Sequence, residues 1–152
     1  MTTPLRCVVD TSVGIKHFIS DRLSPKVNLL FDHLAYPQTE IFVPDLFYIE
    51  SANTFCKYVR ARLYSAAEVH ADLATLKALP LRVVSTADLM EEAVNIALAY
   101  GISAYDASYV ALSQQVGATL LTLHEKLVRA VAATSYDVRS FNDFTIPPLP
   151  SV

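Results

Sequence analysis

Residues 5–12 read LRCVVDTS. The short apolar run at the start of this segment is typical of a buried strand in a parallel sheet. Asp10 ends the run, and Thr11 or Ser12 then caps a predicted helix that reaches about Ile19. The segment therefore predicts a strand followed at once by a helix, with an acid at the junction.

The rest of the chain repeats this alternation of strand and helix. Further strands are predicted at residues 40–43, 81–84, 118–122 and 138–141. Helices are predicted at residues 25–34, 44–62, 65–79, 86–100, 103–117 and 125–133. This order predicts an α/β fold with a mainly parallel central sheet and helices on both faces. Ligands of such folds bind beyond the carboxyl ends of the strands, so a site is expected just after them.

Length and composition limit the classes of protein that remain. The chain has 152 residues, 53% of them hydrophobic, which predicts one domain with a sizeable core and excludes disorder. We assign residues 1–145 to this domain and residues 146–152 to a Pro-rich C-terminal arm. The longest uncharged stretch, residues 107–124, is too polar to span a membrane. A net charge of −3 excludes a nucleic-acid binder driven by bulk positive charge, but it leaves a local site open.

The two cysteines bear on the compartment. Cys7 and Cys56 both lie in apolar runs. We expect both to be reduced core residues of a cytoplasmic protein, because disulfides are rare in that compartment. Asp10 interrupts the one apolar run near the N-terminus, so no secretory signal pattern is predicted there.

Two isolated acids lie at predicted strand or helix junctions. Asp10 suits either a ligand site at the end of its strand or a helix N-cap. Asp106 is the only formally charged residue between Glu92 and Glu125, and its neighbours are mostly apolar. A helix dipole explains an exposed first-turn acid, but acids are rarely buried without a partner. We therefore expect Asp106 to belong to a site.

Glu50 is a third acid in mostly apolar surroundings. At helical spacing it shares one face with Asn53 and Lys57, an arrangement that a solvated helix face also explains. Three converging carboxylates repel one another unless a cation lies between them. Hard oxygen ligands without paired His or Cys indicate Mg²⁺ or Mn²⁺, ions that position and activate water against a phosphate.

Three segments and one acid carry a family resemblance. Residues 8–12 read VVDTS, residues 105–112 read YDASYVAL and residues 117–123 read GATLLTL, with Glu50 in a long predicted helix between the first two. At this mutual spacing they resemble the PIN-domain ribonucleases of the VapC toxin type. The resemblance implies a PIN-like nuclease domain and a metal-dependent endoribonuclease that hydrolyses RNA phosphodiester bonds.

The resemblance also implies roles for particular residues. It makes Asp10, Glu50 and Asp106 the catalytic metal ligands for Mg²⁺ or Mn²⁺, and it puts the hydroxyl of Ser12 near the metal. The fourth acid of the family usually follows the Leu-Leu-Thr strand after one residue.

In this chain the fourth position holds His124, with Glu125 next to it. Ligation by His124 is one interpretation, and a polar residue at a helix start is the other. The replacement of the acid also leaves open a PIN-fold binding module with weak or lost nuclease activity. A receiver or phosphatase of similar topology is a more distant alternative, because Thr11 and Ser12 follow Asp10 where such sites need a second acid.

Partners are implied by the resemblance alone. They are an RNA substrate, a cognate antitoxin protein and a second copy of the chain in a homodimer, in a cytoplasmic setting. Lys16 lies one turn after Ser12, and Lys57 lies two turns after Glu50. Both lysines are candidates for RNA-backbone contacts, although plain solvation is the better explanation of either lysine taken singly.

Overall fold

The computed structural model describes residues 3–151 and has a five-stranded parallel sheet within them. Its strand order is β3-β2-β1-β4-β5, so the first strand is central. The strands are β1 (Arg6–Val9), β2 (Glu40–Pro44), β3 (Arg82–Val84), β4 (Thr119–Thr122) and β5 (Val138–Ser140). All four pairings are parallel, which confirms the predicted fold class.

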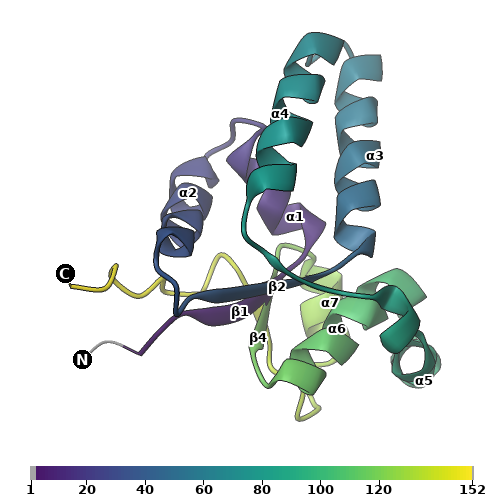
Figure 1. The fold of residues 1–152 in the computed structure, drawn as a ribbon. Helices are drawn as coiled ribbons and strands as arrows, with labels where there is room; N and C mark the ends of the chain where they lie inside the picture. Colours follow the sequence, from purple (N-terminus) through teal and green to yellow (C-terminus); the bar gives the residue numbers. More distant parts are fainter. Residues whose placement is uncertain (1–2, 152) are drawn as a thin grey trace.

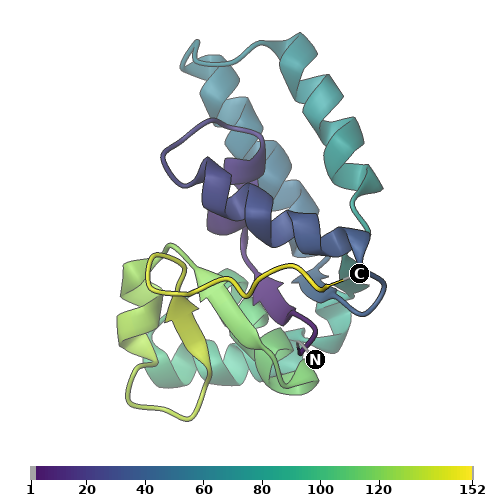
Figure 2. The same ribbon diagram turned by 90° about the vertical axis from the view of Figure 1, so that its left-hand side faces the viewer.

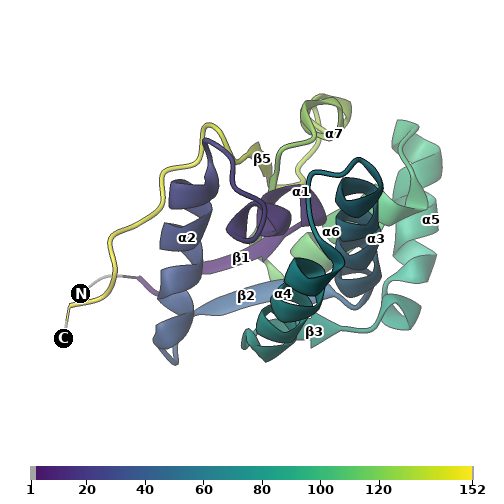
Figure 3. The ribbon, with the colours of Figure 1, turned by 90° about the horizontal axis from the view of Figure 1, so that it is seen from above.

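Helices cover both faces of the sheet (Figures 1 and 3). Residues before β3 form α1 (Thr11–Gly14), η1 (Ile15–His17), α2 (Ser24–Asp32), η2 (His33–Ala35), α3 (Leu46–Arg60) and α4 (Ala66–Ala78). Residues after β3 form η3 (Thr86–Asp88), α5 (Met90–Tyr100), α6 (Ala104–Val116) and α7 (Glu125–Ala130). Figure 1 shows α1 and α2 on one side of the sheet, and α5 and α6 on the other. Helix α6 packs against β1, β2 and β4, and α5 packs on α6. Helices α3 and α4 form a hairpin that stands away from the sheet (Figure 1).

Local signals in the sequence set the helix ends. The Ser65 hydroxyl caps α4 by accepting from the backbone N–H of Glu68 at 3.1 Å, and Ser103 caps α6 in the same way. Gly101 and Gly117 follow α5 and α6 with φ of 68° and 64°. Glycine adopts this left-handed conformation without strain, so it stops a helix cleanly.

The core forms around the central strand and α6. Cys7, Val8 and Val9 of β1 are fully buried, and seven consecutive residues of α6 (107–113) are buried as well. Because α6 lies between the sheet and α5, it is apolar on nearly all sides. Gly14 lets α1 approach α3, since a Cβ there would come within 2.7 Å of the Phe47 ring.

The C-terminal residues form an arm without helix or strand (Figure 2). The arm runs along α2, and Ile146 packs against the core. A hydrogen bond of 2.9 Å joins Nε2 of buried His33 to the carbonyl oxygen of Pro147. The Pro-rich segment therefore packs on the domain of its own chain.

One expectation about the cysteines is wrong. Cys7 is buried in β1 as predicted, but Cys56 is exposed on α3. Adjacent residues of a helix point about 100° apart, and here Phe55 takes the buried direction. Both cysteines are free thiols. Across residues 3–151, no helix combines the length and apolar character needed to cross a bilayer.

Candidate active site

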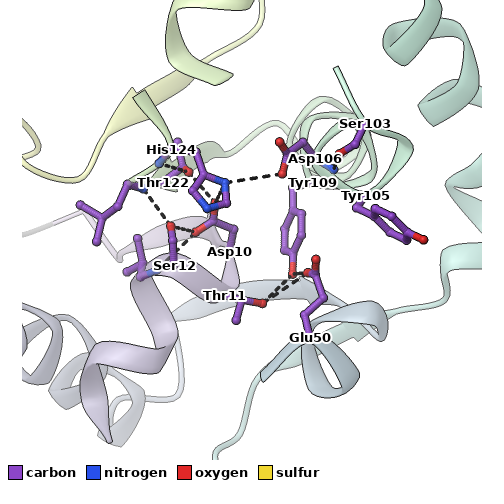
Figure 4. Close-up of polar contacts among 12 residues, drawn as sticks. Asp10, Thr11, Ser12, Glu50, Ser103, Tyr105, Asp106, Tyr109, Thr122 and His124 are labelled. Atoms are coloured by element: carbon purple, nitrogen blue, oxygen red, sulfur yellow. Dashed lines mark hydrogen bonds and ion pairs between the residues drawn. The ribbon is translucent and has the colours of Figure 1, made fainter. Parts of the chain in front are cut away.

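Asp10 lies at the carboxyl end of the sheet, between the ends of β1 and β4 (Figure 4). Asp10 is 2% exposed, and its carboxylate accepts hydrogen bonds from Ser12 Oγ, from Thr122 Oγ1 and from the backbone N–H of Val13 at 3.3 Å. Ser12 Oγ in turn accepts from the backbone N–H of Leu123 at 2.9 Å. The Asp10 side chain is thus both the N-cap of α1 and a buried carboxylate held by donors from α1 and from the end of β4.

The electrostatics of Asp10 favour a nearby positive charge. Burial raises the pKa of its carboxyl group, and the hydrogen bonds from Ser12 and Thr122 oppose this rise. A buried carboxylate is stable in its charged form only with donors or a cation close by.

His124 is the positively chargeable group nearest to Asp10 among the described residues (Figure 4). Its Nδ1 lies 3.6 Å from Asp106 Oδ1 and 3.9 Å from Asp10 Oδ2. The contact with Asp106 raises the pKa of the imidazole, Asp10 and Glu50 add to the rise, and partial burial opposes it. His124 is the N-cap residue of α7, but its side chain makes no capping hydrogen bond to that helix.

Two hydroxyl groups donate hydrogen bonds to Glu50 and connect it to the site (Figure 4). Tyr109 Oη donates to Glu50 Oε1 at 2.6 Å, and Thr11 Oγ1 donates to the same oxygen at 3.3 Å. The two hydroxyl oxygens are 3.2 Å apart. Tyr109 is 2% exposed, and burial first and the Glu50 carboxylate second raise the pKa of its phenol. The phenol therefore keeps its proton and remains a donor.

The remaining candidate residues lie outside this network. Lys16 forms an ion pair of 2.9 Å with Asp21. Asn53 and Lys57 are exposed on α3, with no hydrogen bond to another side chain within residues 3–151. The exposed Glu125 accepts from Ser140 Oγ at 2.6 Å on the side of β5, instead of turning to Asp10.

Three residues of the network, Thr11, Thr122 and Tyr109, are not among the site candidates from the sequence. Thr11 is expected there only as a possible helix cap, Thr122 only as part of a strand, and Tyr109 only as part of the segment 105–112. For Thr122 and Tyr109 a signal is present, because Thr122 ends β4 beside β1 and Tyr109 follows Asp106 by three residues on one helix. Neither signal predicts which acceptor the hydroxyl group of Thr122 or of Tyr109 contacts.

The chemistry of the donor set fits a divalent cation. Asp10, Glu50 and Asp106 come from three different elements, and no Lys or Arg of the described chain forms an ion pair with them. Their oxygens are hard donors of the kind that Mg²⁺ and Mn²⁺ prefer. The side chains are nevertheless not drawn together, since no group of three His, Cys, Asp or Glu within residues 3–151 is arranged to hold an ion.

Comparison with known proteins identifies the family. The model of the PIN domain family matches residues 7–133. The chain belongs to the PIN-domain family. It is also 31% identical over 133 residues to Ribonuclease VapC3 of Pyrobaculum aerophilum, a match that covers 85% of this chain and 97% of the relative. The resemblance seen in the sequence is thereby confirmed at the level of the family.

Solved structures support the same fold. The crystal structure of PAE2754 from P. aerophilum superposes with a TM-score of 0.63 at 20% identity, covering 91% of this chain and 85% of that one. VapC20 of Mycobacterium tuberculosis, a toxin that cleaves the sarcin-ricin loop, has a TM-score of 0.57 at 20% identity and covers 86% and 95%. A toxin-antitoxin complex from Klebsiella pneumoniae has a TM-score of 0.55 at 18% identity and covers 88% and 95%.

Proposed function

We propose that this PIN-domain protein is an endoribonuclease that depends on Mg²⁺ or Mn²⁺. The observation that supports the proposal is the position of Asp10 and Asp106 beside His124 at the carboxyl end of a parallel sheet, with Glu50 hydrogen-bonded to Thr11, the residue after Asp10. Asp10, Glu50 and Asp106 would hold the cation. A bound divalent ion would lower the pKa of water and offset the negative charge of the phosphate.

The side chains around the acids have distinct parts in this proposal. Ser12 and Thr122 orient the Asp10 carboxylate by donating to its two oxygens. Ser103 fixes the first turn of α6, and with it the backbone of Asp106, through a hydrogen bond of 3.0 Å. The exposed Lys57 would meet the RNA backbone, whereas Lys16 would first have to leave Asp21.

We further propose that the protein is the toxin of a toxin–antitoxin pair. The relative at 31% identity is named a ribonuclease VapC, and one structure of the same fold is a toxin-antitoxin complex. The corresponding partners are an RNA substrate, a cognate antitoxin and a second copy of the chain. Two free thiols agree with a cytoplasmic setting.

The test is Asp10→Asn, assayed for RNA cleavage with Mg²⁺ and with Mn²⁺. Mutation of a group that only hydrogen-bonds a metal ligand lowers activity by up to roughly 100-fold. Because Asp10→Asn removes the charge of a ligand itself, it should lower the cleavage rate by more than this. Melting without metal should stay unchanged or rise, since the mutation removes a buried charge. Cleavage by Asp10→Asn at the wild-type rate would refute the proposal. So would cleavage by the wild type that is equally fast with and without a chelator of divalent ions. A clear fall in metal-free stability would assign Asp10 a structural capping role instead.

His124 supports a second candidate, a PIN-fold binding module with weak nuclease activity. The imidazole contacts Asp106 and Asp10, and in its protonated form it repels a metal ion. RNA binding without cleavage under either ion would favour the binding module.

The same residue predicts an ion preference, because a neutral imidazole suits Mn²⁺ better than Mg²⁺. We therefore expect the wild type to prefer Mn²⁺, and His124→Asp to strengthen Mg²⁺ binding and Mg²⁺-dependent cleavage. If the wild type and His124→Asp bind Mg²⁺ with equal affinity, position 124 does not face the site.

A further inference from the structure

The hydroxyl group of Tyr109, a buried residue, joins elements that carry the acids of the site. The phenol lies on α6, one turn after Asp106, and its partner Glu50 lies on α3. Thr11, which completes the triangle, directly follows Asp10. A contact among these three side chains therefore links the helix of each acid to the other two (Figure 4).

The contact leaves the two Glu50 oxygens unequal. Oε1 receives both donors, at 2.6 Å from Tyr109 and 3.3 Å from Thr11. Oε2 accepts no hydrogen bond from the protein within residues 3–151. The 2.6 Å distance is typical of an O–H donor on an ionised carboxylate. One oxygen is thus held by the protein, and the other is left for a ligand.

The burial of Tyr109 makes this contact strong. Tyr109 is 2% exposed, so water has little access to the residue. A hydrogen bond to a charged acceptor in such surroundings is stronger than one at the surface. Glu50 itself is only partly buried, and its neighbour Ile49 is 67% exposed. Without the two hydroxyl groups, little else would restrict the flexible Glu50 side chain.

We infer that Tyr109, assisted by Thr11, is a positioning residue that holds Oε1 of Glu50 and leaves Oε2 available to a divalent cation. This inference rests on the proposed function, since it assumes that Glu50 is a ligand. Tyr109 does not contact the ion or the RNA in this scheme. It fixes a ligand that the backbone alone would leave free to rotate.

The test is a calorimetric Mn²⁺ titration of Tyr109→Phe, which removes the hydroxyl group and keeps the ring. We expect Mn²⁺ affinity to fall about tenfold, the effect of losing one hydrogen bond to a charged group. Tyr105→Phe is the matched control, because Tyr105 is on the same helix and 63% exposed, and it should bind Mn²⁺ within about twofold of the wild type. High Mn²⁺ should restore the cleavage rate of Tyr109→Phe, with the KM for RNA unchanged throughout.

A second substitution separates positioning from general damage. In a Glu50→Gln background, Tyr109→Phe should add almost no further loss of Mn²⁺ affinity, because the two side chains act as one unit. Thr11→Val should weaken Mn²⁺ binding and Thr11→Ser should restore it. If Tyr109→Phe does not fold, the comparison of Mn²⁺ affinity between Thr11→Val and Thr11→Ser tests the inference instead.

Two results would overturn the inference. One is wild-type Mn²⁺ affinity in Tyr109→Phe, and the other is an equal loss of affinity with and without Glu50. Asp10→Asn distinguishes these results from failure of the proposed function. If Asp10→Asn loses Mn²⁺ binding while Tyr109→Phe keeps it, only the positioning role is wrong. If neither variant changes Mn²⁺ binding, the metal site itself is wrong.

Discussion

The N-termini of α4 and α6 have the same local capping motif but lie in different surroundings. In each, a serine before the helix accepts a hydrogen bond from the backbone N–H of an acid three residues later, at 3.1 Å in α4 and 3.0 Å in α6. Glu68 of α4 is exposed to solvent. Asp106 of α6 lies 3.6 Å from His124, beside the ends of β1 and β4. The motif determines a helix start, and the position of the helix relative to the sheet determines whether its acid belongs to a site.

The largest expected difference between the two helices is in activity. Asp106→Asn should reduce RNA cleavage by more than about 100-fold, since a ligand matters more than the groups around it. It should also lose most of the rise in melting temperature that millimolar Mg²⁺ or Mn²⁺ gives the wild type by mass action. Glu68→Gln should change neither quantity. If both variants respond to the ions like the wild type, Asp106 is not a ligand and the two N-termini are equivalent.

The two serine caps give a smaller difference. Ser65→Ala and Ser103→Ala should each cost about 1 kcal/mol of unfolding free energy. In a domain of this size, that lowers the melting temperature by roughly 2–4 °C. Only Ser103→Ala should also slow cleavage, by several-fold, because its cap fixes the turn that bears Asp106. Thermal melting and cleavage assays measured on the same samples separate the two effects, and equal cleavage rates would contradict the comparison.

The smallest expected effect concerns pH and the two histidines near these acids. The acids of the site, Asp106 first, raise the pKa of His124, so its protonated form stabilises the folded protein. This stabilisation is fully present below about pH 6.5, the unperturbed value, and is lost as pH rises through the raised pKa. His124→Gln should therefore lower the melting temperature of the metal-free protein more at pH 5.5 than at pH 8.5.

His70 provides the matched control, because it is an exposed histidine on α4, two residues after Glu68. His70→Gln should have the same small effect on the melting temperature at both pH values. A pH-independent effect of His124→Gln would mean that the contacts with Asp106 and Asp10 contribute nothing to stability.

Much of the fold could be predicted because its signals are local. The apolar run of β1, the Ser caps of α4 and α6, and Gly101 and Gly117 after their helices all act within a few residues. Asp10 and Asp106 were found for a related reason, since an isolated acid in an apolar segment conflicts with its surroundings. The strand–helix alternation then indicated that Asp10 follows a strand end, where ligands bind.

The sequence by itself determined the alternation of strands and helices, the caps and the presence of three isolated acids. Only the tertiary structure decided which groups meet these acids, because those contacts join residues 59 and 112 positions apart, as with Tyr109 on Glu50 and Thr122 on Asp10. It also turned Glu125 toward Ser140 and exposed Cys56. Periodicity and capping are properties of neighbouring residues, whereas side-chain partners depend on strand order and on how each helix packs against the sheet.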